Sequence, residues 1–172
     1  VYKGLNFTAL QTCGTDNCDA NSTYIITSDY AFTNLGTTCG LGGTITVTYT
    51  VSDECNNTTT LTATLTLEDT TPPDLGNCSI TDQTSECSGA NNEAIANQWN
   101  VDNSTALQTC GTDNCDANST YIITSDYAFT NLSTTCGLGG TITVTYTVSD
   151  ECNNTTTLTA TLTLKLYLKN NR

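Results

Sequence analysis

The chain has 172 residues and a net charge of −13 at pH 7, with 17 acidic side chains, four basic ones and no histidine. Since residues 4–164 contain no lysine or arginine, the composition excludes the cation-rich surfaces that bind nucleic acids or anionic membranes, histidine-assisted nucleophiles and phosphate-binding lysine loops. No apolar run approaches the roughly 20 residues that a membrane-spanning helix needs, so we expect no nucleic-acid partner, no membrane insertion and no enzymatic activity.

The first elements predicted along the chain are β-strands. A less regular strand is expected at 22–32, and three glycines between residues 40 and 43 precede a hairpin. Residues 44–51 and 60–67 alternate threonine with apolar residues without an error, which predicts a hairpin with one apolar face and one threonine face. Residues 52–57 between these strands are rich in turn formers.

A joint and a helix are predicted next. Residues 68–74 contain both prolines of the chain, which favours an extended linker. The segment 91–99 has the only helical pattern, because Asn91 can cap its start and Ile95 and Trp99 fall on one face. We therefore predict one short helix in an otherwise β-rich chain.

An internal repeat defines the modules. Residues 8–67 recur at 105–164 with one difference, Gly36 against Ser133, at an offset of 97 residues. Such repeats mark arrays of modules. We predict a partial module at 1–67 that contains only later strands, a joint at 68–74, and a complete module at 75–172 with an extended C-terminal strand. Short alternating strands in a module of about 100 residues predict an antiparallel β-sandwich.

Several motifs in this order resemble one family. The run TYTVSDECNN at 145–154, the threonine strand after it and EDTTPP at 68–73 resemble the hyalin-repeat (HYR-like) modules of Bacteroidota surface adhesins. SEC at 85–87, the Trp99 helix and TDNC at 112–115 are similar to the upstream part of that pattern. The resemblance implies tandem immunoglobulin-like sandwiches on an extracellular, surface-attached protein that acts as a stalk, adhesin or fibre subunit.

Ten cysteines in a small acidic chain indicate an oxidising location, and zinc is disfavoured because no C-x-x-C occurs. Cys39 and Cys55 flank a strand that spans more than about 20 Å, whereas a disulfide tolerates about 7 Å between Cα atoms. If each repeat closes on itself, its first two cysteines pair with its last two, and Cys78 pairs with Cys87. Alternatively, Cys78 and Cys87 bond to the later half of their module and the first module keeps unpaired cysteines. The candidate disulfide residues are Cys13, Cys18, Cys39, Cys55, Cys78, Cys87, Cys110, Cys115, Cys136 and Cys152.

The repeat stops matching beyond Leu164, where KLYL at 165–168 replaces the EDTT of 68–71. The apolar alternation continues through Leu166 and Leu168 and outruns the predicted partner strand, so these side chains need another surface to cover them. The partial first module is expected to present an open sheet edge. A tail that completes the first module of the next subunit would be donor-strand complementation, and its repetition gives a head-to-tail homopolymer.

Two alternatives stay open for these ends. In the first alternative, the leading segment 1–7, and not the tail, is the donated strand. In the second, both ends are arbitrary cuts in a long tandem protein. The candidate subunit–subunit residues are Lys165, Leu166, Tyr167, Leu168, Val1, Leu5 and Phe7.

Calcium and glycans are the two additions that the composition allows. Carboxylates without neighbouring cations suit Ca²⁺, although no Asp-x-Asp-x-Asp-Gly loop occurs and simple solvation is the favoured alternative. The candidate ligands are Glu68, Asp69, Asp74, Asp113, Asp116 and Asp150. Glycan attachment is predicted at sequons or at a threonine, with candidates Asn21, Asn57, Asn77, Asn103, Asn118, Asn131, Asn154 and Thr70.

The sequence favours a structural, adhesive glycoprotein: a subunit of an extracellular bacterial surface fibril or pilus. One alternative is a tandem-repeat stalk of a long surface adhesin. Another is an ice-binding module, because the threonines of 44–50 and 60–66 form two parallel ranks. A glycosidase is disfavoured, since the paired acids at 53–54 and 150–151 lie in predicted hairpin turns, where burial does not tune their pKa.

Overall fold

The computed structural model describes residues 10, 14–17, 24–115, 121–136 and 138–167, without the side chains of residues 135 and 136. The chain divides into unit 1, which is Val1–Thr38 with Gly42–Glu68, and unit 2, which is Cys39–Leu41 with Asp69–Arg172. The boundary after Glu68 lies within the segment for which a joint was predicted. Most described residues of ordered elements are in strands, so the predicted all-β character is confirmed.

Unit 1 is built on one four-stranded sheet. The long strand β3 pairs antiparallel with β4 from Gly43↔Leu67 to Ser52↔Thr58, and it pairs with β1 along its other side. The strand predicted at 22–32 is shorter than expected, because a turn of 3₁₀-helix follows it. The elements are β1 (Ile25–Ser28), η1 (Phe32–Asn34), β2 (Gly36–Cys39), β3 (Gly42–Ser52) and β4 (Thr58–Leu67).

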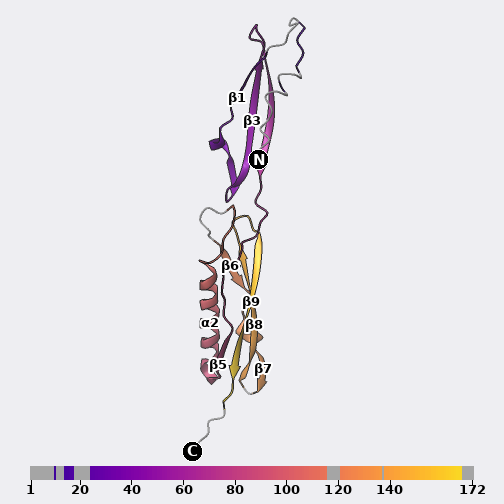
Figure 1. The fold of residues 1–172 in the computed structure, drawn as a ribbon. Coiled ribbons are helices and arrows are strands. Elements are labelled where there is room, and N and C mark those ends of the chain that lie inside the picture. Colours follow the sequence, from indigo (N-terminus) through magenta and orange to yellow (C-terminus); the bar gives the residue numbers. More distant parts are fainter. Residues whose placement is uncertain (1–9, 11–13, 18–23, 116–120, 137, 168–172) are drawn as a thin grey trace, which may run out of the picture. The chain divides into compact units, whose positions relative to one another are not determined.

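Unit 2 repeats this arrangement and adds a strand and a helix (Figure 1). In its five-stranded sheet, β9 lies between β8, to which it is antiparallel, and β5, to which it is parallel. The helix α2 contacts β6, β9 and η3 of the same unit. The elements are β5 (Gln83–Glu86), η2 (Gly89–Asn91), α2 (Asn92–Leu107), β6 (Ile122–Ser125), η3 (Phe129–Asn131), β7 (Ser133–Cys136), β8 (Gly139–Ser149) and β9 (Thr155–Lys165).

Both predicted hairpins form, with their threonines in register across the strands. Thr46 and Thr64 place their hydroxyl oxygens 3.1 Å apart, and the equivalent pair of unit 2 has the same separation. The turn of unit 1 requires Asn56 in the left-handed region at φ 65°, which asparagine tolerates better than most residues. Gly43 has no room for a side chain, because a Cβ there would overlap the carbonyl of Gly36.

The helix starts where it was predicted but is longer, reaching Leu107 instead of residue 99. Its buried side chains recur every three or four residues, and two of them, Asn92 and Asn103, are polar. Thr81 satisfies Asn103: its backbone N–H donates to Asn103 Oδ1 at 2.9 Å, and its carbonyl accepts from Trp99 Nε1 at 2.8 Å. A polar residue in the buried stripe conceals the second half of the helix from pattern analysis.

The core of unit 2 is larger than that of unit 1. In unit 2 the helix and the sheet enclose a continuous cluster, whose largest fully buried hydrophobic side chains are those of Trp99, Leu107, Val144, Tyr146, Val148 and Leu162. Among the described residues of unit 1, the buried hydrophobic side chains are Ile45, Val47 and Tyr49. Within the described part of the chain each unit has a single hydrogen-bonded sheet, and no second sheet faces it.

Candidate functional site

The strands β4 and β9 have the same sequence over ten residues but different surroundings. In unit 2, β5 pairs with the outer edge of β9, and Leu162 and Leu164 are 0% and 2% exposed. The counterparts in unit 1 are only partly buried. Among the described strands, none pairs with the outer edge of β4. The part of unit 1 that the structure describes therefore has an uncovered edge and a thinly covered apolar face.

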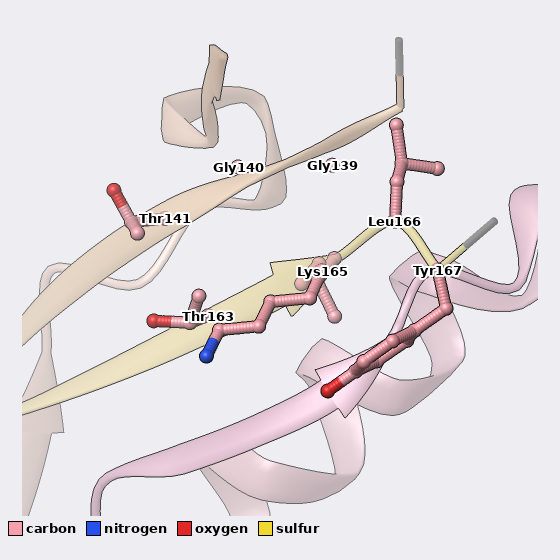
Figure 2. A pocket seen from close by; sticks show the side chains of 8 residues that line it. Gly139, Gly140, Thr141, Thr163, Lys165, Leu166 and Tyr167 are labelled. Carbon is pink, nitrogen blue, oxygen red and sulfur yellow. The ribbon is translucent and has the colours of Figure 1, made fainter. Parts of the chain in front are cut away.

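The end of β9 presents further apolar side chains. Lys165 is the last strand residue; it pairs with Glu86, and its carbonyl accepts the N–H of Cys87 at 2.7 Å. Beyond it, Leu166 and Tyr167 are 49% and 61% exposed. Figure 2 shows their side chains pointing in opposite directions, so the alternation of the strand continues past its last hydrogen-bonded residue.

An open hollow of about 410 Å³ lies beside this strand end, between residues 139–141 at the start of β8 and residues 163–167 (Figure 2). On the β8 side it is lined by two buried glycines, Gly139 and Gly140. The hollow and the exposed Leu166 agree with the expectation that the strand end needs a covering surface. Leu168, Val1, Leu5 and Phe7, the other predicted subunit–subunit residues, lie outside the described residues.

The cysteines do not pair within each repeat. Cys78 bonds to Cys110, with the Cα atoms 5.2 Å apart, and not to Cys87, which is a free thiol. The predicted Cys78–Cys87 pair is therefore wrong. Of the alternative, the bond of Cys78 to the later part of its module is confirmed, and the bond of Cys87 to that part is not formed. The reason is that α2 returns the chain to the joint, where the backbones of Asp74 and Thr112 form a two-hydrogen-bond bridge of 2.8 and 3.1 Å.

The second described disulfide joins Cys39 to Cys152. The scheme in which Cys39 and Cys152 each pair inside their own repeat is therefore wrong, whereas the expected absence of a Cys39–Cys55 bond agrees with the structure, in which Cys55 is an exposed thiol. Cys115 is partly buried, and its backbone N–H donates to Asp113 at 2.8 Å. Cys13, Cys18 and the side chain of Cys136 lie outside what the structure describes.

Unit 2 holds the turn Cys39–Leu41 through hydrogen bonds as well as through this disulfide. The N–H of Gly40 donates to Glu151 Oε2 at 3.1 Å, and the N–H of Leu41 donates to the carbonyl of Cys115 at 2.9 Å. The receiving surface consists of the hairpin turn at 150–154 and the backbone of Cys115. A specific surface, and not the disulfide alone, thus recognises the turn.

That hairpin turn is organised by Asp150, which is 2% exposed. Its carboxylate accepts the backbone N–H groups of Cys152 and Asn154, both at 2.8 Å, and the side-chain amide of Asn154 at 2.9 Å. In unit 1 the carboxylate of Asp53 accepts the backbone and side-chain N–H groups of Asn57, both at 2.7 Å. The bond from the Asn57 amide lowers the pKa of the exposed Asp53 carboxyl.

The predicted calcium ligands fall into separate places. Carboxylate oxygens of Asp69 and Asp150 lie within 4.8 Å of each other and of Cys152 Sγ. The sulfur is bonded to Cys39 and is therefore no thiolate ligand. Asp74 and Asp113 line a second hollow, at the joint, where each accepts a nearby backbone N–H at 2.8 Å.

These contacts use carboxylate oxygens to close local turns. One oxygen of Asp113, Oδ2, is buried without a hydrogen-bond partner. Glu68 belongs to unit 1, and Asp116 lies outside the described residues. Calcium binding stays a prediction, with Asp69 beside Asp150 and Asp74 beside Asp113 as its two separate candidate pairs.

The predicted glycan acceptors differ in accessibility. Asn77, Asn131 and Thr70 are exposed. Asn103 is 2% exposed and bonded to Thr81, so the folded chain does not present it. The amides of Asn57 and Asn154 donate to the aspartates of their turns. Asn21 and Asn118 lie outside the described part of the chain.

The disulfides indicate a non-cytoplasmic protein. Among the described helices, none combines the length and the apolar character needed to cross a bilayer. Comparison of the chain with protein-family models and with curated proteins gives no match.

Proposed function

We propose that the chain is a structural subunit of an extracellular bacterial surface fibril, a pilus-like filament that assembles head-to-tail by β-strand complementation. The observation that supports this most is the difference in burial between the strands β4 and β9. The same residues are covered by β5 and α2 in unit 2 and are left partly exposed by the described elements of unit 1. Because the two strands are identical, a segment of another copy can complete β4 with the chemistry that β5 provides to β9.

The register of β5 indicates where a donated strand would lie. Gln83 pairs with Leu162 and Glu86 with Lys165, in parallel orientation. The corresponding stretch of unit 1 is 65–68, so a donated strand would run parallel to the end of β4 and cover Leu65 there. Full burial of a leucine side chain contributes about 1.5–3 kcal/mol relative to exposure, so a few such contacts support a stable junction.

The tail 165–168 and the leading segment 1–7 are the two candidate donors. The exposed Leu166 supports the tail. Three of the four basic residues lie at or after position 165, and the rest of the chain is acidic. Opposite charges of this kind accelerate encounter and orient the partners.

The finer features of the proposal come from the resemblance to HYR-like modules. They are an immunoglobulin-like relationship of the two units, adhesion as the role of the filament, and glycans on exposed acceptors such as Asn77, Asn131 and Thr70. We also propose that the chain has no catalytic role and is a module of extracellular surface assembly.

The test is electron microscopy combined with light scattering on the purified chain over a range of concentrations. Filaments with a regular axial repeat are the expected result. Leu166→Asp should shorten or abolish them, whereas Val101→Asp, a matched change at a residue that is 54% exposed on α2, should not. If Leu5→Asp abolishes filaments and Leu166→Asp does not, the leading segment is the donor. Monodisperse monomers at every concentration would refute assembly and favour a single-chain stalk.

One observation favours ice binding as a second candidate. The hairpin of unit 1 aligns four threonine pairs across its strands, from Thr44↔Thr66 to Thr50↔Thr60. Such ranks of hydroxyl and methyl groups could order water on a small plane, although strands twist and limit its extent. Thermal hysteresis of a solution of the chain decides this candidate: none at millimolar concentration excludes it.

A further inference from the structure

A five-residue segment, SDYAF, occurs once in each unit and has different surroundings in the two. It occupies residues 28–32 of unit 1 and 125–129 of unit 2. In unit 2 Phe129 is partly buried and packs against the core cluster formed by α2 and the sheet. In unit 1 the aromatic pair of this segment, Tyr30 and Phe32, is 57% and 58% exposed. Side chains that are covered in one unit are therefore presented to solvent in the other.

The helix α2, which contacts β6 and η3, bonds to this segment in unit 2. The hydroxyl of Tyr127 donates to Asn97 Oδ1 at 2.6 Å, and the hydroxyl of Ser125 donates to Asn100 Oδ1 at 3.2 Å. The two asparagines are three positions apart, so they lie on the same side of the helix. They border its buried stripe, in which Trp99 is 2% exposed. The segment thus holds a helix that combines asparagine amides with an apolar stripe.

The segment has the same backbone conformation in unit 1. The N–H of Asp29 donates to the carbonyl of Thr48 at 3.2 Å, and the equivalent bond in unit 2 has the same length. Ala31 has φ −144° and ψ 125°, and its counterpart has −145° and 123°. Because this backbone is already fixed, a helix can dock on the aromatic pair without rearranging unit 1.

One described residue of unit 1 lies where the end of α2 lies in unit 2. Leu10 is helical and packs against the buried cluster of its unit. Its counterpart, 97 residues later, is Leu107, the last residue of α2, which is completely buried. Unit 1 therefore accommodates a helical residue at this position. The aromatic pair, which corresponds to the surface that meets Asn97, stays exposed.

We propose that the aromatic pair of unit 1 is a docking site for an amphipathic helix of another polypeptide chain, with the chemistry of the first half of α2. Such a helix presents two asparagines three positions apart, which accept hydrogen bonds from the hydroxyls of Ser28 and Tyr30. The apolar stripe beside them covers Phe32. The site lies at β1 and η1 and not at the outer edge of β4, so the inference goes beyond strand complementation and does not depend on it.

The test uses a fluorescein-labelled peptide of residues 88–107, which contains no cysteine, and the full chain. Fluorescence anisotropy should show saturable binding. The difference circular dichroism should gain a helical signal, because so short a helix is marginal alone in water. Phe32→Asp should weaken binding by roughly tenfold or more, since it removes the burial of an aromatic ring. Ile122→Asp, at a residue that is 62% exposed in unit 2, is the matched control and should leave binding unchanged.

A double-mutant cycle tests the predicted contact itself. Tyr30→Phe in the chain removes the donor and Asn97→Ala in the peptide removes its acceptor, so each should weaken binding by about two- to tenfold. Together they should weaken it no more than either alone, since both remove the same hydrogen bond. Val101→Ala in the peptide is the control, because Val101 is 54% exposed on α2. Full additivity of the two changes would overturn the proposed contact.

The remaining outcomes separate this inference from the proposed fibril. Saturable binding without filaments supports the helix site and overturns head-to-tail assembly. Filaments without peptide binding overturn the helix site alone, and so does equal binding to the parent chain and to Phe32→Asp. If the peptide does not bind and Phe32→Asp lowers the mass measured by light scattering, the aromatic pair joins two copies of this chain, which also overturns the proposal.

Discussion

Leu162 and Leu65 occupy the same position of two strands of identical sequence, yet Leu162 is completely buried in unit 2 and Leu65 is only partly buried in unit 1. Both leucines alternate with threonines, and each lies in a strand that pairs with a neighbouring strand in the same register. The difference arises from β5 and α2, which cover the unit 2 sheet. The two units therefore provide an internal comparison, in which the local sequence is constant and only the covering elements change.

The first prediction uses this comparison. Leu162→Ala should lower the free energy of unfolding of unit 2 by about 2–5 kcal/mol, because it opens a cavity in a closed core. Leu65→Ala is the matched control and should leave unit 2 unchanged. Trp99, the one tryptophan of the chain, is 2% exposed in unit 2, so its fluorescence during urea unfolding measures that unit. Equal shifts of the tryptophan transition for both variants would contradict the assignment of the two cores.

The second prediction concerns the Cys78–Cys110 disulfide. It closes a loop that contains β5 and α2, with a sequence separation of 32 residues. Loss of the bond frees this loop in the unfolded chain and should cost unit 2 about 3–4 kcal/mol. The double variant Cys78→Ser with Cys110→Ser should therefore shift the tryptophan transition to lower urea. Cys87→Ser serves as the control, and an unchanged midpoint for the double variant would show that the loop is fixed by packing alone.

The fold was predictable where the pattern was strictly periodic. The alternating threonine hairpins and the start of α2 follow directly from spacing two and spacing four in the sequence. The second half of α2 could not be predicted, because the buried polar side chain of Asn103 is hydrogen-bonded to Thr81, a residue 22 positions earlier. A hydrogen bond over that distance leaves no local trace in the sequence.

The candidate site was harder to predict, since it depends on what covers a strand. The strands β4 and β9 have identical sequences but differ in burial, so no rule based on local sequence can tell which of them is covered. The pairing of Cys39 with Cys152, at a separation of 113 residues, depends on which turn is brought against which hairpin. The repeat offset of 97 residues was the usable signal, because it shows that Cys152 and Cys55 are the same element in two contexts.

The third prediction is a loss of stability at alkaline pH. Burial raises the pKa of Tyr146, and burial followed by the negative charge of Glu93 raises the pKa of Tyr127. Because the folded pKa values exceed the unfolded value of about 10, the neutral form is favoured by folding. The stabilisation is complete below pH 10 and is lost as the pH rises toward the folded pKa values.

Urea midpoints of unit 2 at pH 8 and pH 11, measured by circular dichroism after the free thiols are blocked, check this dependence. Tyr146→Phe removes one ionising group and should lose less stability between the two pH values than the parent chain. An identical loss in both proteins would show that the alkaline effect originates elsewhere.

The fourth prediction concerns Asp150, whose carboxylate accepts three hydrogen bonds within its turn while it is 2% exposed. Asp150→Ala leaves two backbone N–H groups without their acceptor, and hydrogen bonds to charged groups contribute about 1.5–3 kcal/mol each, so the unfolding free energy of unit 2 should fall by at least about 2 kcal/mol. Asp53→Ala makes the same change in the exposed turn of unit 1 and should leave the Trp99 transition where it was. If Asp150→Ala instead keeps that transition and the Cys39–Cys152 bond still forms quantitatively, the turn is held by the strands alone. Its carboxylate would then be available for another role, such as sharing a cation with Asp69.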